Sequence, residues 1–232
     1  MTDLVALQGS SDRLVRTVDG LSDDDLAAPS LLPGWSRGHV VAHLALNGEG
    51  LAGALEGVVN GEPVPMYASQ EARERDIAEL ATASADQLRA RLMAAVTRFA
   101  DAAGRITGEH EDDTFPRVPG GPDVRAGAAA DHRRVEVEVH HTDLGAGYGP
   151  GDWPAEFCVH LLDAFTGRRP HWQPPFVADP ADASGTWDLG ATDARSPVVS
   201  GPIRGLVAWV TGRGDGAQLS STTGTLPTIG KW

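Results

Sequence analysis

The spacing of apolar residues in the first 145 positions constrains the fold more than any other feature of this sequence. In residues 69–104, apolar side chains recur every three or four positions with charged residues between them. This spacing places them on one face of a helix. The same spacing occurs in residues 3–20 and in the tract that begins at Ser36. With a fourth helical tract at residues 125–144, the pattern predicts four principal helices, which would pack as an up-down bundle.

Polar residues indicate where helices begin and where the pattern is interrupted. Ser22, which precedes three aspartates, and Ser36 are expected N-caps. The tract at residues 69–104 is expected to break near Thr82–Ser84, where Ser84 would cap the start of a second helix. Residues 105–124 contain three prolines and many acidic residues, so they predict a loop or irregular strand.

Two of the helical tracts carry features that weaken a helix. The VEVEV stretch within residues 125–144 alternates as a strand would, but its alanine-rich lead-in favours a helix. The tract after Ser36 contains four glycines, which lower helix stability yet permit close approach of a neighbouring element: Gly48, Gly50, Gly53 and Gly57.

A run dense in glycine and proline, GAGYGPGDWP at residues 145–154, marks the expected domain boundary. The sequence after it predicts a helix over 156–167, short strands in PFVADP, GTWDLG and PVVSG, and a further helix over 202–212. We therefore expect two domains, residues 1–148 and residues 149–232. The first is mainly α, and the second is a small α/β unit.

Charge and cysteine content narrow the partners and the compartment. Thirty-two acidic residues against 19 basic ones give a net charge of −13, which disfavours binding to nucleic acid or to an anionic membrane. No apolar run approaches the roughly 18 residues of a membrane span, and the first residues lack the layout of a signal peptide. The single cysteine, Cys158, lies among apolar residues and is expected in the core. We expect a cytoplasmic protein, either a monomer or a homodimer.

Three residues in two of the helical tracts could bind a metal ion. Glu136 and His140 are four residues apart, so they share one face of a helix. His43 lies among apolar residues that would face the bundle interior. One carboxylate and two imidazoles suit zinc and leave a position open for water or substrate. A buried histidine that binds no metal remains the simpler alternative, and spacing leaves other ligands open: His39, Asp131, His132, Glu138 and His141.

Two longer elements carry a family resemblance. The first is LSDDDLAAPSLLPGWSRGHVVAHLALN, with the pattern Gly-Trp-Ser-x3-Val-x2-His-Leu, and the second is RRVEVEVHHTDLGAGY, with the pattern Arg-x-Val-Glu-x3-His-His-x-Asp-Leu. In order and separation they resemble the mycothiol-dependent maleylpyruvate isomerase family of the DinB-like metalloprotein superfamily. The tail, with GPIRGLVAWVTGR and LPTIGKW, is similar as well, so the resemblance spans nearly the whole chain.

The resemblance implies a fold and a set of site residues. The fold would be a DinB-like four-helix bundle followed by a small α/β domain similar to sterol-carrier proteins. The ligands of a Zn²⁺ ion would be His43, Glu136 and His140. An active-site arginine of the C-terminal domain would correspond to Arg213, with Arg204 as the alternative.

The resemblance also implies a reaction. Mycothiol, a small thiol cosubstrate, would add to the cis double bond of maleylpyruvate, and rotation followed by elimination would give fumarylpyruvate. A zinc ion would favour the thiolate, and an arginine would bind a substrate carboxylate. The same ligands would serve a mycothiol S-transferase that acts on another electrophile in detoxification or biosynthesis. A metal- or ligand-binding protein without turnover is the alternative of another class.

Composition agrees with a mycothiol producer. All but one of the 19 basic residues are arginine, and alanine, glycine and aspartate are abundant. This bias indicates a GC-rich genome, such as that of an actinobacterium.

The remaining conspicuous residues are assigned structural roles. Trp35 is expected to pack at the bundle entrance, with lining of the pocket as the alternative. Asp143 is expected to accept a hydrogen bond from a ligand imidazole, with a solvent-facing position as the alternative. Arg133 and Arg134 are expected to form surface salt bridges, with an anionic ligand as the alternative. Two histidines outside the motifs receive no function: His160 and His171.

Overall fold

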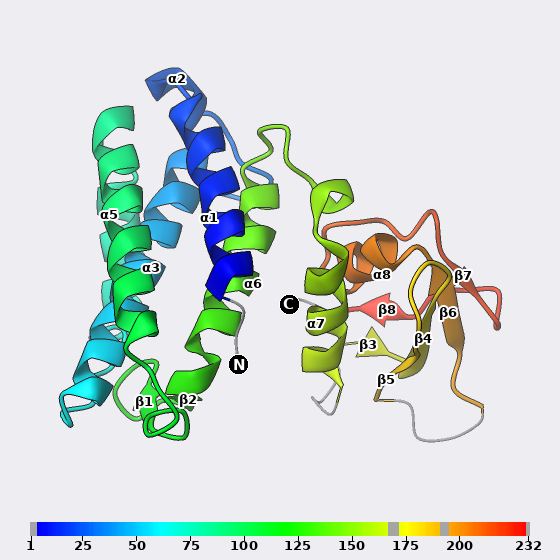
Figure 1. Cartoon of the computed structure of the whole chain (residues 1–232). Helices are drawn as coiled ribbons and strands as arrows, with labels where there is room; N and C mark the ends of the chain where they lie inside the picture. Colours follow the sequence, from blue (N-terminus) through cyan, green and yellow to red (C-terminus); the bar gives the residue numbers. More distant parts are fainter. Residues whose placement is uncertain (1–3, 167–171, 191–194, 231–232) are drawn as a thin grey trace. The chain divides into compact units, whose positions relative to one another are not determined.

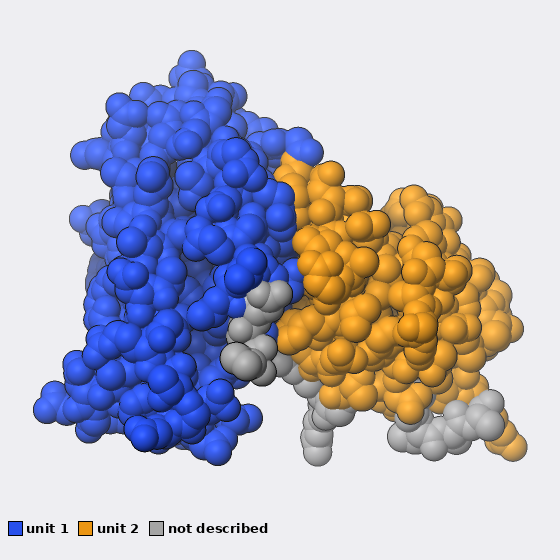
Figure 2. Space-filling model, in the orientation of Figure 1, with its two compact units in different colours: residues 1–147 blue, residues 148–232 orange. Residues whose placement is uncertain are grey.

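The computed structural model describes residues 4–166, 172–190 and 195–230 (Figure 1). The chain divides into two compact units, residues 1–147 and 148–232 (Figure 2). His171 lies outside the described residues. Among the helices in the described ranges, none combines the length and apolarity needed to cross a membrane.

The first unit is a four-helix bundle, as expected. Its long helices are α1 (Leu4–Asp19), α3 (Arg37–Val59), α5 (Ala85–Gly104) and α6 (Ala129–Asp143), accompanied by the shorter α2 (Asp23–Ala27) and α4 (Gln70–Leu80). Helix α3 contacts α5 and α6, and α1 contacts the same two helices, so the four surround one core. Side chains from all four bury themselves there, including Leu14, Leu44, Leu88 and Val137.

The expected helix starts are confirmed. The side chains of Ser22, Ser36 and Ser84 each accept a hydrogen bond from the backbone N–H three residues later, at the first turns of α2, α3 and α5. The tract at residues 69–104 breaks as predicted, because α4 ends at Leu80 and α5 begins after Ser84.

The VEVEV stretch lies wholly within α6, so the helical interpretation is confirmed. Its alternation does not mark two faces, because three consecutive residues are buried: Val137, Glu138 and Val139 are at most 1% exposed. The carboxylate of Glu138 pairs there with Arg13 of α1 at 2.8 Å. Helix α6 is therefore enclosed on most sides, which a two-sided pattern cannot show.

Close approach at the glycines of α3 is confirmed for three of the four. A Cβ atom on Gly48 would lie 3.2 Å from Nη2 of Arg133 and 3.3 Å from the Cβ of Ala95. A Cβ atom on Gly57 would lie 2.7 Å from the carbonyl oxygen of Glu62, and one on Gly50 would lie 2.9 Å from that of Met66. At Gly53 the nearest atom would be 3.7 Å away, an ordinary contact. The segment that follows α3 therefore packs directly against α3 itself.

The region predicted as loop or irregular strand contains a small hairpin. Strands β1 (Thr114–Pro116) and β2 (Asp123–Arg125) pair antiparallel, and the 3₁₀ turn η1 (Ala126–Ala128) leads into α6. The backbone N–H groups of Met66 and Tyr67 donate to the carbonyl oxygens of Pro116 and Arg117, both at 3.1 Å. These bonds fix the segment between α3 and α4 against the hairpin.

The second unit is a small α/β domain, as expected. The order is η2 (Pro150–Asp152), α7 (Ala155–Phe165), β3 (Trp172–Gln173), β4 (Phe176–Pro180), β5 (Trp187–Leu189), β6 (Val198–Gly201), α8 (Ile203–Val210), β7 (Ser220–Ser221) and β8 (Thr228–Ile229). One sheet has the order β5-β4-β6-β7, with β4 and β6 parallel, and β3 pairs with β8. Helix α8 contacts α7 and strands β4 and β6. Strands β3, β7 and β8 were not predicted, because two residues show no alternation.

Candidate metal centre

The structure brings His43, Glu136 and His140 together. His43 lies on α3 and is 3% exposed, whereas Glu136 and His140 lie one turn apart on α6, which packs against α3. One donor atom from each residue lies within 4.8 Å of the other two. Within the described ranges, they are the only three His, Cys, Asp or Glu residues grouped in this way.

The three side chains converge on a single carboxylate oxygen. Glu136 Oε2 lies 2.8 Å from His43 Nε2 and 3.3 Å from His140 Nε2. The two imidazole rings are perpendicular, with centroids 4.7 Å apart. The Nε2 atom of each histidine therefore points into the same space as the carboxylate.

The electrostatics of the site favour the ligand forms of His43 and Glu136. Burial lowers the pKa of His43 to about 4, although the hydrogen bond that His43 donates to Glu136 opposes this shift, so His43 is neutral at pH 7. Burial opposes ionisation of Glu136, but hydrogen bonds with His140 and His43 hold its pKa well below the ordinary value. Burial likewise lowers the pKa of His140, but bonds to Asp143 and Glu136 outweigh it and raise that pKa overall.

Asp143 orients one of the imidazoles. Its Oδ2 lies 2.8 Å from His140 Nδ1, and its side chain is 2% exposed. In neutral His140 this bond keeps the proton on Nδ1 and leaves Nε2 free to bind a metal. The expected contact of Asp143 with an imidazole of the candidate site, here that of His140, is confirmed.

Two further residues contact His43. The ring of Trp35 lies edge-on to the His43 ring with centroids 5.8 Å apart, so Trp35 borders the site as well as packing against the bundle core. Arg73 of α4 places Nη2 3.0 Å from His43 Nδ1. Sequence reasoning missed Arg73, although it precedes Ile77, the buried residue of α4, by one turn and thus shares its inward face.

Comparisons with known proteins identify the family. Residues 7–145 match the mycothiol maleylpyruvate isomerase N-terminal domain, and residues 152–230 match the MDMPI C-terminal domain. The chain belongs to the mycothiol-dependent maleylpyruvate isomerase family.

Solved structures agree with this assignment. A crystal structure of the mycothiol-dependent maleylpyruvate isomerase matches this chain with a TM-score of 0.85 at 28% identity, over 99% of this chain and 95% of that one. A mutant of that isomerase with one histidine replaced by alanine matches with a TM-score of 0.84 at the same identity. No match was found among curated proteins.

The alternative ligands in this family member are engaged elsewhere. His39 Nδ1 lies 2.8 Å from the hydroxyl of the serine that caps α3. His141 Nε2 lies 2.7 Å from Thr17 Oγ1, and Glu138 pairs with Arg13, so both contact α1. In the described part of the chain, none of the five alternatives joins the group around Glu136: His39, Asp131, His132, Glu138 and His141.

The prediction of surface salt bridges for Arg133 and Arg134 is wrong. Arg133 is 1% exposed, and its Nη1 donates to Leu44 O at 2.8 Å and to Asn47 Oδ1 at 2.7 Å. Arg134 is 8% exposed. Both are buried because α6 is enclosed on most sides, so a charged residue there faces protein.

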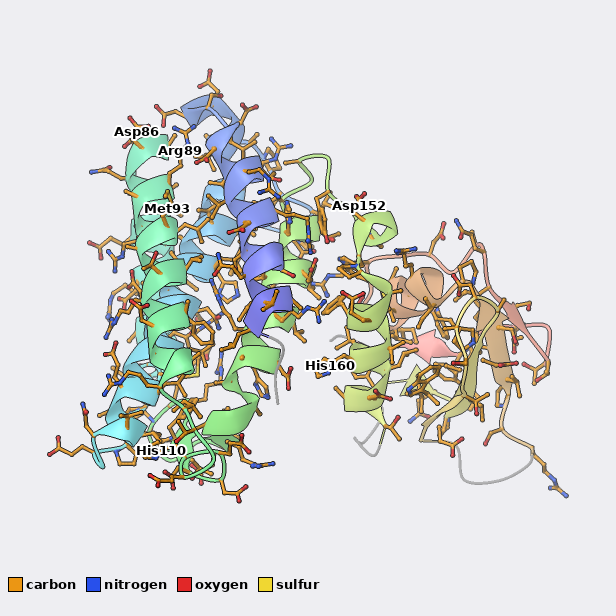
Figure 3. All side chains as sticks on the ribbon, in the orientation of Figure 1. Asp86, Arg89, Met93, His110, Asp152 and His160 are labelled. Carbon is orange, nitrogen blue, oxygen red and sulfur yellow. The ribbon has the colours of Figure 1, made fainter. Side chains whose placement is uncertain are left out.

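The remaining residues singled out in the sequence lie in the second unit. Arg213 follows α8, is half-buried, and donates through Nη1 to Thr211 O at 2.6 Å. Arg204 donates through Nε to Trp153 O at 2.6 Å. Cys158 is buried in α7, as expected, and His160 lies on the same helix (Figure 3).

The donor set of this isomerase-family site fits a divalent metal ion. Two imidazoles and an ionised carboxylate are the ligands of catalytic metal sites that keep a position open. His140 has the carboxylate partner typical of a metal-bound histidine. The residues present therefore suit a metal that also binds an exogenous ligand.

Proposed function

We propose that this protein is a metal-dependent enzyme that uses mycothiol to isomerise the cis double bond of maleylpyruvate or a related electrophile. The observation that carries the proposal is the convergence of His43, Glu136 and His140 in a chain of this family. The solved relative, named as a mycothiol-dependent maleylpyruvate isomerase, supports the choice of thiol and electrophile.

We propose Zn²⁺ as the ion, with His43, Glu136 and His140 as its ligands. A zinc ion there would lower the pKa of a bound thiol and supply a thiolate near neutral pH. The carboxylate of Glu136 offsets part of the ion's charge, and Asp143 holds His140 in the ligating tautomer. Trp35 packs against the His43 ring with a T-shaped geometry.

The electrophile's chemistry needs addition and elimination at one carbon. A C–S bond forms as the double bond becomes single, the molecule rotates about that bond, and loss of the same thiolate restores the double bond in the trans form. The thiol is regenerated, so it acts catalytically. We propose that Arg213 is the catalytic arginine that binds a carboxylate of the electrophile, with Arg204 as the alternative.

The fate of the thiol separates the candidate functions. Zinc-loaded protein would be incubated with maleylpyruvate and a tenfold smaller amount of mycothiol. The proposal predicts complete conversion to fumarylpyruvate with the free thiol recovered, and loss of conversion in His43→Ala. One adduct per mycothiol would instead indicate an S-transferase. No conversion and no adduct would leave a metal- or ligand-binding protein without turnover.

A further inference from the structure

Two guanidinium groups flank one aromatic ring beside the metal centre. The Cζ atoms of Arg73 and Arg117 each lie 5.6 Å from the centroid of the Tyr67 ring. Arg73 comes from α4 and Arg117 directly follows β1, and the backbone bond from Tyr67 N to Arg117 O fixes their approach. Two like charges near one ring are unfavourable unless an anion accompanies them.

Neither arginine is neutralised by a carboxylate in the described residues. Arg117 Nη1 donates to the neutral Gln70 Oε1 at 3.0 Å, and Arg73 Nη2 contacts the neutral His43. The Nε of Arg73 is buried without a hydrogen-bond partner in the part of the chain described. By contrast, Arg91 and Arg98 each donate two hydrogen bonds to the carboxylate of a glutamate. In a chain of net charge −13, this cluster is a local excess of positive charge.

The contact between Arg73 and His43 is compatible only with the metal-free site. A guanidinium only donates, so His43 Nδ1 accepts and the imidazole proton lies on Nε2, facing Glu136. Metal ligation through Nε2 requires that proton on Nδ1 instead. Two N–H donors would then face each other, so Arg73 loses this acceptor when the site is loaded.

A cavity beside Arg73 is large enough for a small organic acid. Its volume is about 270 Å³, and its lining includes Tyr67, Arg73 and Met66. Two acidic residues, Glu49 and Asp76, also line it, but each pairs with another arginine of the bundle. They therefore do not neutralise Arg73.

We propose that Arg73, with Arg117 beside it, binds a carboxylate of the electrophilic substrate next to the metal centre. This inference rests on the proposed function and extends it, because it assigns a carboxylate-binding arginine to the bundle in addition to Arg213. The substrate class is then an electrophile with two carboxylates. A guanidinium suits this task because it binds a carboxylate with two parallel hydrogen bonds.

The test is the binding of maleate, a cis-dicarboxylate, to zinc-loaded protein without thiol, measured by calorimetry. We expect Arg73→Met to weaken maleate binding at least tenfold. Arg73→Lys should have a smaller effect, because lysine keeps the positive charge but lacks the paired N–H donors of the guanidinium. The zinc affinity of Arg73→Met should be equal or higher, because a competitor for His43 and a nearby cation are removed. A purely structural role for Arg73 would instead lower zinc affinity.

Arg125→Met is the matched control, since Arg125 is 60% exposed and pairs with Asp112, and neither residue lines the cavity. It should change neither maleate nor zinc binding. Unchanged maleate affinity in both Arg73→Met and Arg117→Met would overturn the inference, as would a wild type that binds no maleate. If the wild type binds zinc and mycothiol, such a result removes only the carboxylate assignment. A wild type that binds neither zinc nor mycothiol removes the proposed function itself.

Discussion

Asp143 Oδ2 lies 2.8 Å from His140 Nδ1, on the side of the imidazole opposite the nitrogen that faces Glu136. Because Asp143 is 2% exposed, water competes little for this bond. The pair therefore sets the orientation, the tautomer and the basicity of one proposed ligand before any metal arrives.

Replacing Asp143 by Asn should weaken zinc binding by about 10–100-fold. The charge of Asp143 helps to raise the pKa of His140, so its loss lowers that pKa. Protons then compete with zinc only at lower pH, and the acid limb of the zinc-binding profile should move to lower pH. Competition with a chromophoric chelator across the pH range measures both effects.

Asp113→Asn is the control for that prediction. Asp113 Oδ2 lies 3.1 Å from His110 Nδ1 with the same three-residue spacing, but this pair is more exposed and lies outside the proposed site (Figure 3 labels His110). It should leave zinc binding unchanged. An Asp143→Asn variant with wild-type zinc affinity and an unmoved acid limb would contradict the role given to Asp143.

The metal-free protein should lose stability on acidification because of His43. Its pKa is lowered from 6.5 to about 4 in the folded state, so the unfolded chain takes up the proton first as pH falls. Stability contributed by neutral His43 is therefore present above about pH 6.5 and is lost toward pH 4. Between about pH 7.5 and about pH 5 the expected loss is about 2 kcal/mol. Urea unfolding at the two pH values, with chelator present, measures it.

His43→Gln should lack this component of the pH dependence. The lowered pKa of Glu136 acts below its ordinary value of 4.5, and the raised pKa of His140 acts above 6.5 with the opposite sign. Between pH 4.5 and pH 6.5, therefore, neither group replaces the contribution of His43 to the pH dependence of stability. Identical acid dependence in His43→Gln and wild type would show that His43 is not a neutral buried imidazole.

Gly57→Ala should destabilise the bundle by about 1–3 kcal/mol, measured as a shift in urea midpoint. A Cβ atom there would lie 2.7 Å from the backbone oxygen of Glu62, and that segment leads to Tyr67. Gly53→Ala on the same helix has room for its Cβ, so it should stabilise by about 0.5–1 kcal/mol through helix propensity. Equal effects at the two positions would mean that close packing of the 60–68 segment is not what Gly57 serves.

Local features of the fold were predictable from the sequence, and contacts across helices were not. The caps at Ser22, Ser36 and Ser84 depend on a few neighbouring residues, so pattern reasoning found them. The two-residue strands β3 and β8 exist only through pairing with each other, about 55 positions apart, which no local pattern records.

The same distinction between local features and contacts across helices holds for the candidate site. The spacing of Glu136 and His140 predicts a shared helix face, and apolar neighbours made His43 a candidate partner. The choice of this set over five other possible ligands rested on family resemblance. Arg73 was missed because its contact with His43 depends on α4 returning against α3. Arg133 was misassigned because burial on most sides of α6 cannot be read from its own sequence.

The most direct test of the central claim is the zinc content of protein purified without chelator. The wild type should hold about one zinc per chain, and His43→Ala should hold almost none. His39→Gln, one turn earlier on α3, should retain wild-type zinc, because His39 bonds to the cap of that helix and not to the site. Full zinc occupancy in His43→Ala, or no zinc in the wild type, would contradict the account.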